Sequence, residues 1–299
     1  MDLLATMRIY VRVVERGTMS AAARDLDIGQ PTVSERIEKL EKFLGVRLLM
    51  RGPRALTCTE EGRIFYKRSK DLLDGAEDAI ASIVRGDVNG IHGIVRLAAP
   101  QCLGETVLPP VLLMIREAYP RLNIDLVLND LVVDPVTEGV DISLRLGRLD
   151  DGGYVAHSIG RVRRMLVAAS SYLEKFGGIE TIEDLARHPF IREKDTFGGE
   201  QLPLLSDDGS LQHGRIQTVM TTSHWRPMFH TIEAAGGIGV VQRPACITSL
   251  SRGQLVELLP QYTIPDFELH ALVMGRCVLP PRVRAILDLL KAEIPKLLV

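Results

Sequence analysis

The feature that most constrains the fold is an alternation of strand-like and helix-like segments that runs from residue 94 to the end of the chain. Apolar runs typical of strands lie at 94–98, 122–128, 141–146, 164–168, 216–220, 238–241 and 269–274. Helical patterns lie between them at 108–119, 171–176, 182–186, 225–235 and 282–298. This order predicts an α/β fold with mainly parallel sheets, long enough for two lobes. The polar segment 195–214 is expected to be a loop.

The first sixty residues follow a helical pattern instead. Apolar residues recur on one helical face at Leu3, Met7, Tyr10 and Val14. We expect Gly17 to end this helix and Ser20 to cap a short second one. A turn at 27–29 should lead into a third helix from Pro31 to Leu44, because a proline costs nothing at a helix start. Two helices joined by a tight turn are typical of a helix-turn-helix.

A hairpin and a long helix should follow. Residues 46–50 and 55–58 can pair as strands around a basic turn, which would form a wing. Thr59 is placed to cap a helix that extends to about residue 84, before a glycine-rich hinge at 86–93. Apolar residues recur along this helix with coiled-coil-like spacing at Phe65, Leu72, Ala76, Ala79 and Ile83. The stripe is either a dimer seam or core packing under the C-terminal domain, and its length favours the seam.

The third helix presents polar side chains near its N-terminus, where a helix can read DNA. Gln can bind adenine through two hydrogen bonds, Thr can contact a thymine methyl group, and Ser can bind phosphate. The free N–H groups of a helix start also favour phosphate. The alternative is a solvated face of a helical bundle. The polar set is Gln30, Thr32, Ser34, Glu35 and Lys39.

The charge of the chain is −2 overall but uneven. Residues 1–59 contain ten Lys and Arg against seven Asp and Glu, a balance of +3, which leaves −5 for the rest. This asymmetry suits nucleic-acid binding by the first segment, although it is mild. Arg51 and Arg54 on the wing can enter a minor groove, whereas arginines on a turn are more often simply solvated.

No catalytic or metal-binding pattern stands out. The seven histidines lack metal-ligand spacing, and the four distant cysteines are expected to be reduced thiols. The glycines at 236–239 lie between a helix and a strand, which favours a tight connection over a phosphate cradle. We therefore expect no enzyme, no cofactor and no metal. Since neither a signal peptide nor a membrane span is visible, we expect a cytoplasmic protein without a membrane partner.

Two sets of short motifs run in order through nearly the whole chain. The first set lies at 20–26, 30–34, 37, 40–41, 44–45, 48–49 and 59–62. The second set lies at 108–110, 119–120, 138–147, 184–189, 234–239 and 253–260. Together they resemble the LysR-type transcriptional regulators. Each motif is weak alone, but their number, order and spacing make the resemblance specific.

The resemblance implies a domain plan. It places a winged helix-turn-helix at 1–59, a dimerising linker helix at 60–86, a hinge at 87–93, and an effector-binding domain at 94–299. The last would have two α/β lobes like type 2 periplasmic binding proteins. A small-molecule effector between the lobes would modulate promoter binding or DNA bending by a homotetramer built from two dimers. RNA polymerase is a further possible partner.

The same resemblance implies site residues. DNA contacts are expected at Ser20, Gln30, Pro31, Thr32, Ser34, Arg36, Arg51 and Arg54. Effector contacts are expected at Pro100, Gln101, Cys102, Arg145, Thr222, Ser223 and Arg243. Arg145 and Arg148 make an anionic effector, such as a carboxylate, plausible. The alternative role for them is in surface or lobe-bridging ion pairs.

The chain departs from the family pattern at several positions. Residues 99–102 lack the Ser or Thr that many members have, and Ser223 stands where many have Asn, so the effector's identity stays open. Cys58 and Glu61 replace a usual Leu and Ala and affect packing only. A rival interpretation is a solute-binding protein or an enzyme built on the α/β domain alone. The lack of a signal peptide and of a catalytic set argues against it.

Overall fold

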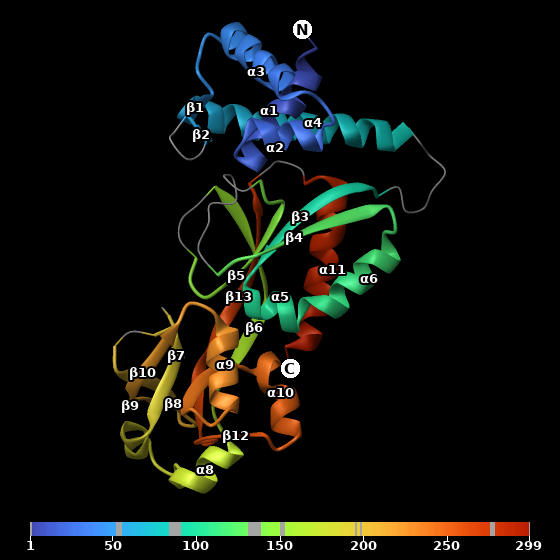
Figure 1. Cartoon of the computed structure of the whole chain (residues 1–299). Coiled ribbons are helices and arrows are strands. Elements are labelled where there is room, and N and C mark those ends of the chain that lie inside the picture. Colours follow the sequence, from blue (N-terminus) through green and yellow to red (C-terminus); the bar gives the residue numbers. More distant parts are fainter. Residues whose placement is uncertain are drawn as a thin grey trace.

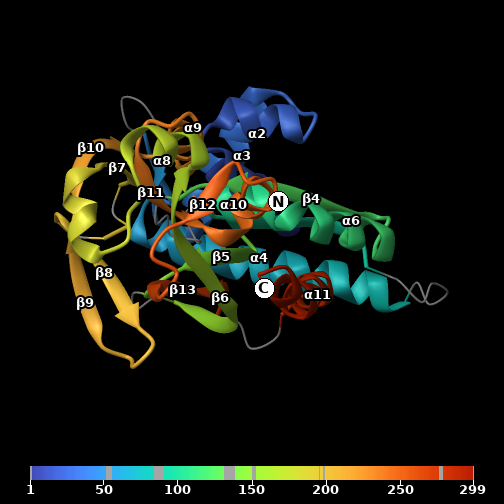
Figure 2. The same cartoon turned by 90° about the horizontal axis from the view of Figure 1, so that it is seen from below.

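The computed structural model describes residues 2–51, 56–83, 91–130, 139–149, 153–194, 196–197, 199–275 and 279–298. A helical N-terminal unit is followed by two lobes that each combine sheet and helices, arranged end to end (Figure 1). Figure 2 views the same arrangement from the end where the second lobe lies. The predicted combination of a helix-turn-helix with a two-lobed α/β domain is confirmed. Within these ranges, no helix has the length and apolar character needed to cross a membrane.

Three helices build the N-terminal unit, and their ends follow from local sequence. They are α1 (Leu3–Arg16), α2 (Met19–Asp25) and α3 (Gln30–Leu44). Gly17 and Gly45 adopt left-handed φ values of 65° and 73° and end α1 and α3, as predicted for glycine after a helix. The prediction of Ser20 as a cap is wrong. Thr18 caps α2 instead, because its Oγ1 accepts the Ala21 N–H at 3.2 Å, and Ser20 lies inside the helix.

The hairpin and the long helix are both present. Strands β1 (Leu49–Arg51) and β2 (Leu56–Cys58) pair antiparallel, so the first strand begins later than its predicted start at residue 46. Thr59 Oγ1 accepts the Gly62 N–H at 2.9 Å and caps α4 (Glu60–Ile83), as predicted. The wing tip, 52–55, and most of the expected hinge, 84–90, lie outside the described residues.

The first lobe is built on three parallel strands. They are β3 (Gly93–Ala99), β4 (Leu122–Leu128) and β5 (Ile142–Leu146), with β3 in the middle. The helices of this lobe are α5 (Gln101–Thr106), α6 (Leu108–Ala118) and α11 (Pro281–Leu297). Apolar side chains of α6 and α11 pack with those of the strands into one continuous core.

The second lobe repeats this plan with its own core. Its parallel strands are β7 (Pro189–Glu193), β10 (Gln217–Thr222) and β11 (Ile238–Gln242). Its helices are α8 (Ser170–Phe176), α9 (Trp225–Glu233) and α10 (Arg243–Ser251), with a 3-10 turn at Ile182–Arg187. A short strand, β12 (Leu255–Glu257), extends the sheet of this lobe by pairing antiparallel with residues 167–169.

Two long strands connect the lobes. Strands β6 (Tyr154–Ala169) and β13 (Tyr262–Met274) pair antiparallel and run through both lobes, so the sheet is mixed rather than mainly parallel. At the end of this pairing, where Arg164 is in register with Ile264, the buried Arg164 donates to the Pro265 carbonyl oxygen and stacks 4.0 Å above the Phe267 ring. The polar-loop prediction for 195–214 is wrong, because β8 (Gln201–Ser206) and β9 (Leu211–Arg215) form a hairpin there.

Candidate functional site

The N-terminal half of α3 forms the first candidate site. Gln30, Pro31 and Thr32 are exposed, while Ser34 and Arg36 are half-buried. The N-cap residue, Gly29, has no side chain, so no side chain satisfies the first N–H groups of the helix. These N–H groups and the polar side chains together can donate to phosphate and to base edges.

Buried contacts hold this helix in place. Val33, Ile37 and Leu40 are at most 2% exposed and pack into the core of the N-terminal unit. At the other end of the helix, Glu41 Oε1 accepts the N–H groups of Leu48 and Leu49 at 2.8 and 3.1 Å. The exposed face of α3 is therefore presented on a rigid support.

The remaining predicted DNA contacts lie around α3. Ser20 is exposed on α2, and a hollow lined by Ser20, Arg24 and Gln30 joins the two helices. Arg51 ends β1, whereas Arg54 lies outside the described residues. The structure thus brings Ser20 next to the start of α3.

Helix α4 divides its apolar residues between two faces. Tyr66 and Leu73 are buried, whereas Ile64 and Leu72 on the other face are 59% and 53% exposed. Phe65, which the stripe had placed on the dimer seam, packs against the Tyr10 ring with centroids 5.4 Å apart. Its side chain therefore belongs to the N-terminal core. Ile64, which the predicted stripe does not include, lies on the exposed face instead.

The second candidate site lies where the strands of both lobes end. On the first lobe, Pro100, Gln101 and Cys102 follow β3, and the Gln101 N–H donates to Asp130 Oδ1 at 2.8 Å. The parallel register of Ala98 with Ser143 places Arg145 level with Pro100 on the neighbouring strand. Pro100, Gln101 and Cys102 thus lie with Arg145 at the same edge of the first lobe's sheet.

The second lobe contributes the other expected residues. Thr222 stands in register with Glu193 at the ends of β10 and β7, and its hydroxyl donates to the His224 carbonyl at 2.6 Å. Ser223 is exposed beyond it, and Arg243 begins α10. Both α9 and α10 contact α5 of the first lobe, so the two lobes meet beside the segments that carry these residues.

Acidic groups surround the Cys102 thiol at this interface. Cys102 is 2% exposed and packs with the second lobe's core, although α5 belongs to the first lobe. Burial, reinforced by the Glu193 carboxylate, raises the pKa of this thiol. Burial, with a smaller contribution from Asp130, also raises the pKa of Glu193 to about 7. Glu193 can therefore carry a proton near neutral pH.

An ion pair that the sequence did not indicate joins the lobes. Glu105 of α5 binds Arg226 at the start of α9, and its other oxygen lies 4.0 Å from His224 Nε2. Neither motif nor spacing connects residues so far apart in the chain. Only the packing of α5 against α9 brings them together.

The described residues give no sign of a metal centre. Among them, no group of His, Cys, Asp or Glu side chains is arranged to hold an ion. Cys58, Cys102 and Cys246 are free thiols, and Cys277 lies outside the described residues.

Comparisons with known proteins match both parts of the chain. Residues 4–63 match the family "Bacterial regulatory helix-turn-helix protein, lysR family". Residues 89–295 match the family "LysR substrate binding domain". The HTH-type transcriptional activator AaeR of Escherichia coli K12 is 29% identical over 294 residues, covering 96% of this chain and 93% of AaeR.

Solved structures agree with these matches. CrgA, a LysR-type transcriptional regulator from Neisseria meningitidis, is 26% identical with a TM-score of 0.62, covering 97% of this chain and 98% of CrgA. Full-length AphB, a virulence activator of Vibrio cholerae, has a TM-score of 0.61 at 24% identity, covering 98% of this chain and 99% of AphB. The likeness to AphB supports the fold alone.

Proposed function

Because this chain belongs to the LysR family of transcriptional regulators, we propose that α3 reads promoter DNA with the side chains near its N-terminus. Transcription regulation through a helix-turn-helix is the function that the family shares. The observation that carries the proposal is the exposed set Gln30, Pro31 and Thr32 on a helix whose other face is buried. Such a helix can enter the major groove without distortion of its own domain.

The proposal assigns different roles to the residues around α3. Gln30, Pro31, Thr32 and Ser34 would contact base edges, whereas Arg36 would bind phosphate and fix the register. Ser20 on α2 would add a phosphate contact. Arg51 and Arg54 of the wing would reach the neighbouring minor groove.

We propose that α4 pairs with the α4 of a second copy. The exposed Ile64 and Leu72 lie two helical turns apart on the face that its own domain leaves uncovered. Exposed apolar residues at such spacing are suited to a helix–helix seam. Two such dimers would form the tetramer on promoter DNA, where RNA polymerase is a further possible contact.

We propose the domain plan 1–59, 60–86, 87–93 and 94–299, with a small-molecule effector between the lobes. Gln101, Thr222 and Arg243 would contact it from three strand ends, together with Pro100, Cys102 and Ser223. Arg145 would bind a carboxylate of the effector, since guanidinium and carboxylate form charge-assisted hydrogen bonds. No catalytic role is proposed, and the site of action is the cytoplasm, where promoter DNA lies.

The mechanism that this arrangement suits is a population shift. An effector that binds one angle between the lobes more tightly would favour that angle, and the tetramer would then present its DNA-binding pairs differently. The coupling is reciprocal, so operator DNA should change effector affinity by the same factor. Calorimetric titration of wild type and Arg145→Ala with aromatic and dicarboxylic acids tests the effector site. If no acid binds wild type, or Arg145→Ala binds equally well, the carboxylate assignment fails.

Fluorescence anisotropy with labelled duplex tests the DNA-binding proposal. The probe is the region upstream of the protein's own coding sequence, and scrambled duplex is the reference. We expect Thr32→Ala to weaken binding to the upstream duplex about tenfold, with a steep dependence on salt for wild type. Glu38→Ala, an exposed change two turns further along α3, is the matched control. Equal affinity for both duplexes at every salt concentration would contradict the proposal.

A further inference from the structure

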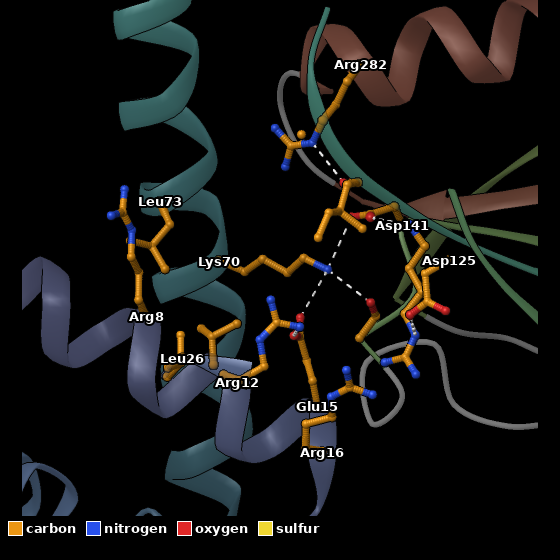
Figure 3. Close-up of a pocket in the computed structure, with 15 residues that line it drawn as sticks. Arg8, Arg12, Glu15, Arg16, Leu26, Lys70, Leu73, Asp125, Asp141 and Arg282 are labelled. Carbon is orange, nitrogen blue, oxygen red and sulfur yellow. Dashed lines mark hydrogen bonds and ion pairs between the residues drawn. The ribbon is translucent and has the colours of Figure 1, made fainter. Parts of the chain in front are cut away.

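The N-terminal unit, α4 and the first lobe meet at a junction that none of the functions above uses. At its centre lies Lys70 of α4, whose side chain is 9% exposed. Its Nζ lies 3.2 Å from Asp141 Oδ1 at the start of β5 and 3.8 Å from Glu15 Oε1 of α1. It also donates to the Gly139 carbonyl oxygen at 3.1 Å. One buried cation thus joins all three parts (Figure 3).

The junction is closely packed on one side. Gly139 has a φ of +63°, and a Cβ there would lie 2.6 Å from Tyr66 Oη and 2.7 Å from Glu15 Cγ. The Tyr66 hydroxyl donates to Glu15 Oε1 at 3.4 Å. Only glycine allows the first lobe to approach α1 and α4 so closely.

Beside this contact the junction opens into a cavity of ≈ 330 Å³. Cationic side chains from α1, α4, β3 and α11 line it, namely Arg8, Arg12, Arg16, Lys70, Arg96 and Arg282. Only three acidic side chains line it, namely Glu15, Asp125 and Asp141. The lining side chains therefore carry an excess of three positive charges. Asp25, which lies outside the lining, offsets part of this excess, because it lies 3.8 Å from Arg12 Nε and 2.5 Å from Arg16 Nε. The remaining excess favours an anion in the cavity.

The acidic groups of the wall are already engaged. Glu15 and Asp141 lie beside Lys70, and Asp125 lies 3.2 Å from Arg96 Nε. Arg8, which is exposed on α1, makes no ion pair among the described residues. Figure 3 shows the Arg8 and Arg12 guanidinium groups on α1, across the cavity from Asp125 and Arg282 on the first lobe. A ligand between them would contact two separate parts of the molecule.

We propose that this cavity is an anion-binding site, separate from the site between the lobes, that takes a small ligand carrying two negative charges. Its volume lies near the lower limit of about 300 Å³ for small-molecule pockets, which suits inorganic phosphate or a short dicarboxylate. Arg8 and Arg12 bind one end of the anion, and Arg96 binds the other. Because these residues belong to α1 and β3, a bound anion fixes the N-terminal unit against the first lobe.

Calorimetric titration of the full chain with inorganic phosphate and with succinate, at constant ionic strength in chloride, tests this site. We expect saturable binding of at least one ion to wild type and about tenfold weaker binding to Arg8→Gln and to Arg12→Gln, as is typical for one charge-assisted hydrogen bond. Arg252→Gln, an exposed change on the second lobe, should leave binding unchanged. Binding of phosphate alone would assign the site to oxyanions, and binding of succinate alone to carboxylates.

Two results would overturn the proposal. The first is binding of neither ion above chloride. The second is a titration that Arg145→Gln weakens while Arg8→Gln does not, because the anion would then occupy the site between the lobes. The DNA-binding assay is run without phosphate or succinate, so failure here and failure of the proposed function remain distinguishable.

Discussion

The buried carboxylate of Glu41 gives a sharp test of how α3 is held. Its side chain is 8% exposed, and one oxygen accepts two N–H groups, from Leu48 and Leu49, which are 1% and 9% exposed. A buried N–H that loses its acceptor costs about 1–3 kcal/mol, so Glu41→Ala should cost about 2–6 kcal/mol. Its ion pair with Arg47 adds little, because Arg47 is 79% exposed.

Glu41→Gln separates the two contributions. Glutamine keeps an amide oxygen for both N–H groups and loses only the charge, so we expect a cost of about 1 kcal/mol. Hydrogen–deuterium exchange of the peptide 40–51 in the full chain reports this local stability. A loss of about 3 kcal/mol corresponds to roughly 100-fold faster exchange.

The control is Glu38→Ala, an exposed change on the same helix, for which exchange should stay within about twofold of wild type. If Glu41→Ala and Glu41→Gln accelerate exchange equally, the unsatisfied N–H groups are not the cause of the lost stability.

Three further predictions concern α4 and the lobes. Gly62→Ala places a Cβ 2.1 Å from the Leu48 carbonyl oxygen and should lower the stability of the fold by about 1–3 kcal/mol. The Cβ of Gly75→Ala meets nothing within 4 Å, so this change should stabilise α4 by up to about 1 kcal/mol. If calorimetric unfolding finds Gly62→Ala the more stable of the two, the packing around Gly62 is contradicted. Folding raises the pKa of Glu193 from 4.5 to about 7, so between these values Glu193 stays protonated in the folded chain but ionises in the unfolded chain. The free energy of unfolding should therefore fall as pH rises across this window and level off above it. Glu193→Gln should flatten the corresponding fall in melting temperature, and an unchanged pH profile would contradict this prediction. Glu105→Gln breaks the ion pair with Arg226 between the lobes. Because Arg226 is 48% exposed, hydrogen exchange in α9 should become faster by about fivefold at most. Unchanged exchange in both α5 and α9 would argue against a stabilising ion pair.

Local signals in the sequence predicted the N-terminal unit well. Gly17, Gly45 and Thr59 end or begin helices through their own backbone freedom or hydroxyl groups, which depend on a few neighbouring residues. The cap of α2 was misplaced by two residues because Thr18 and Ser20 both carry a suitable hydroxyl. Only the backbone path after Gly17 decides between them.

Signals of longer range were missed for physical reasons. The hairpin of β8 and β9 looks like a polar loop because much of its surface faces solvent, although Gly209 at its turn has a φ of 84°. Strand β6 reaches back to Tyr154 through exposed polar residues that pairing with β13 keeps extended. The sequence also could not pair Lys70 with Asp141, because that contact depends on how α4 packs against the first lobe.

Base reading by the start of α3 can be tested by selecting binding sites from a pool of random duplex DNA. Wild type and Thr32→Ala are carried through the same selection at the same salt concentration. We expect wild type to enrich two related half-sites, and Thr32→Ala to keep their spacing but lose base preference at one position of each half-site. Enrichment of no sequence by wild type, or of an identical motif by both proteins, would contradict it.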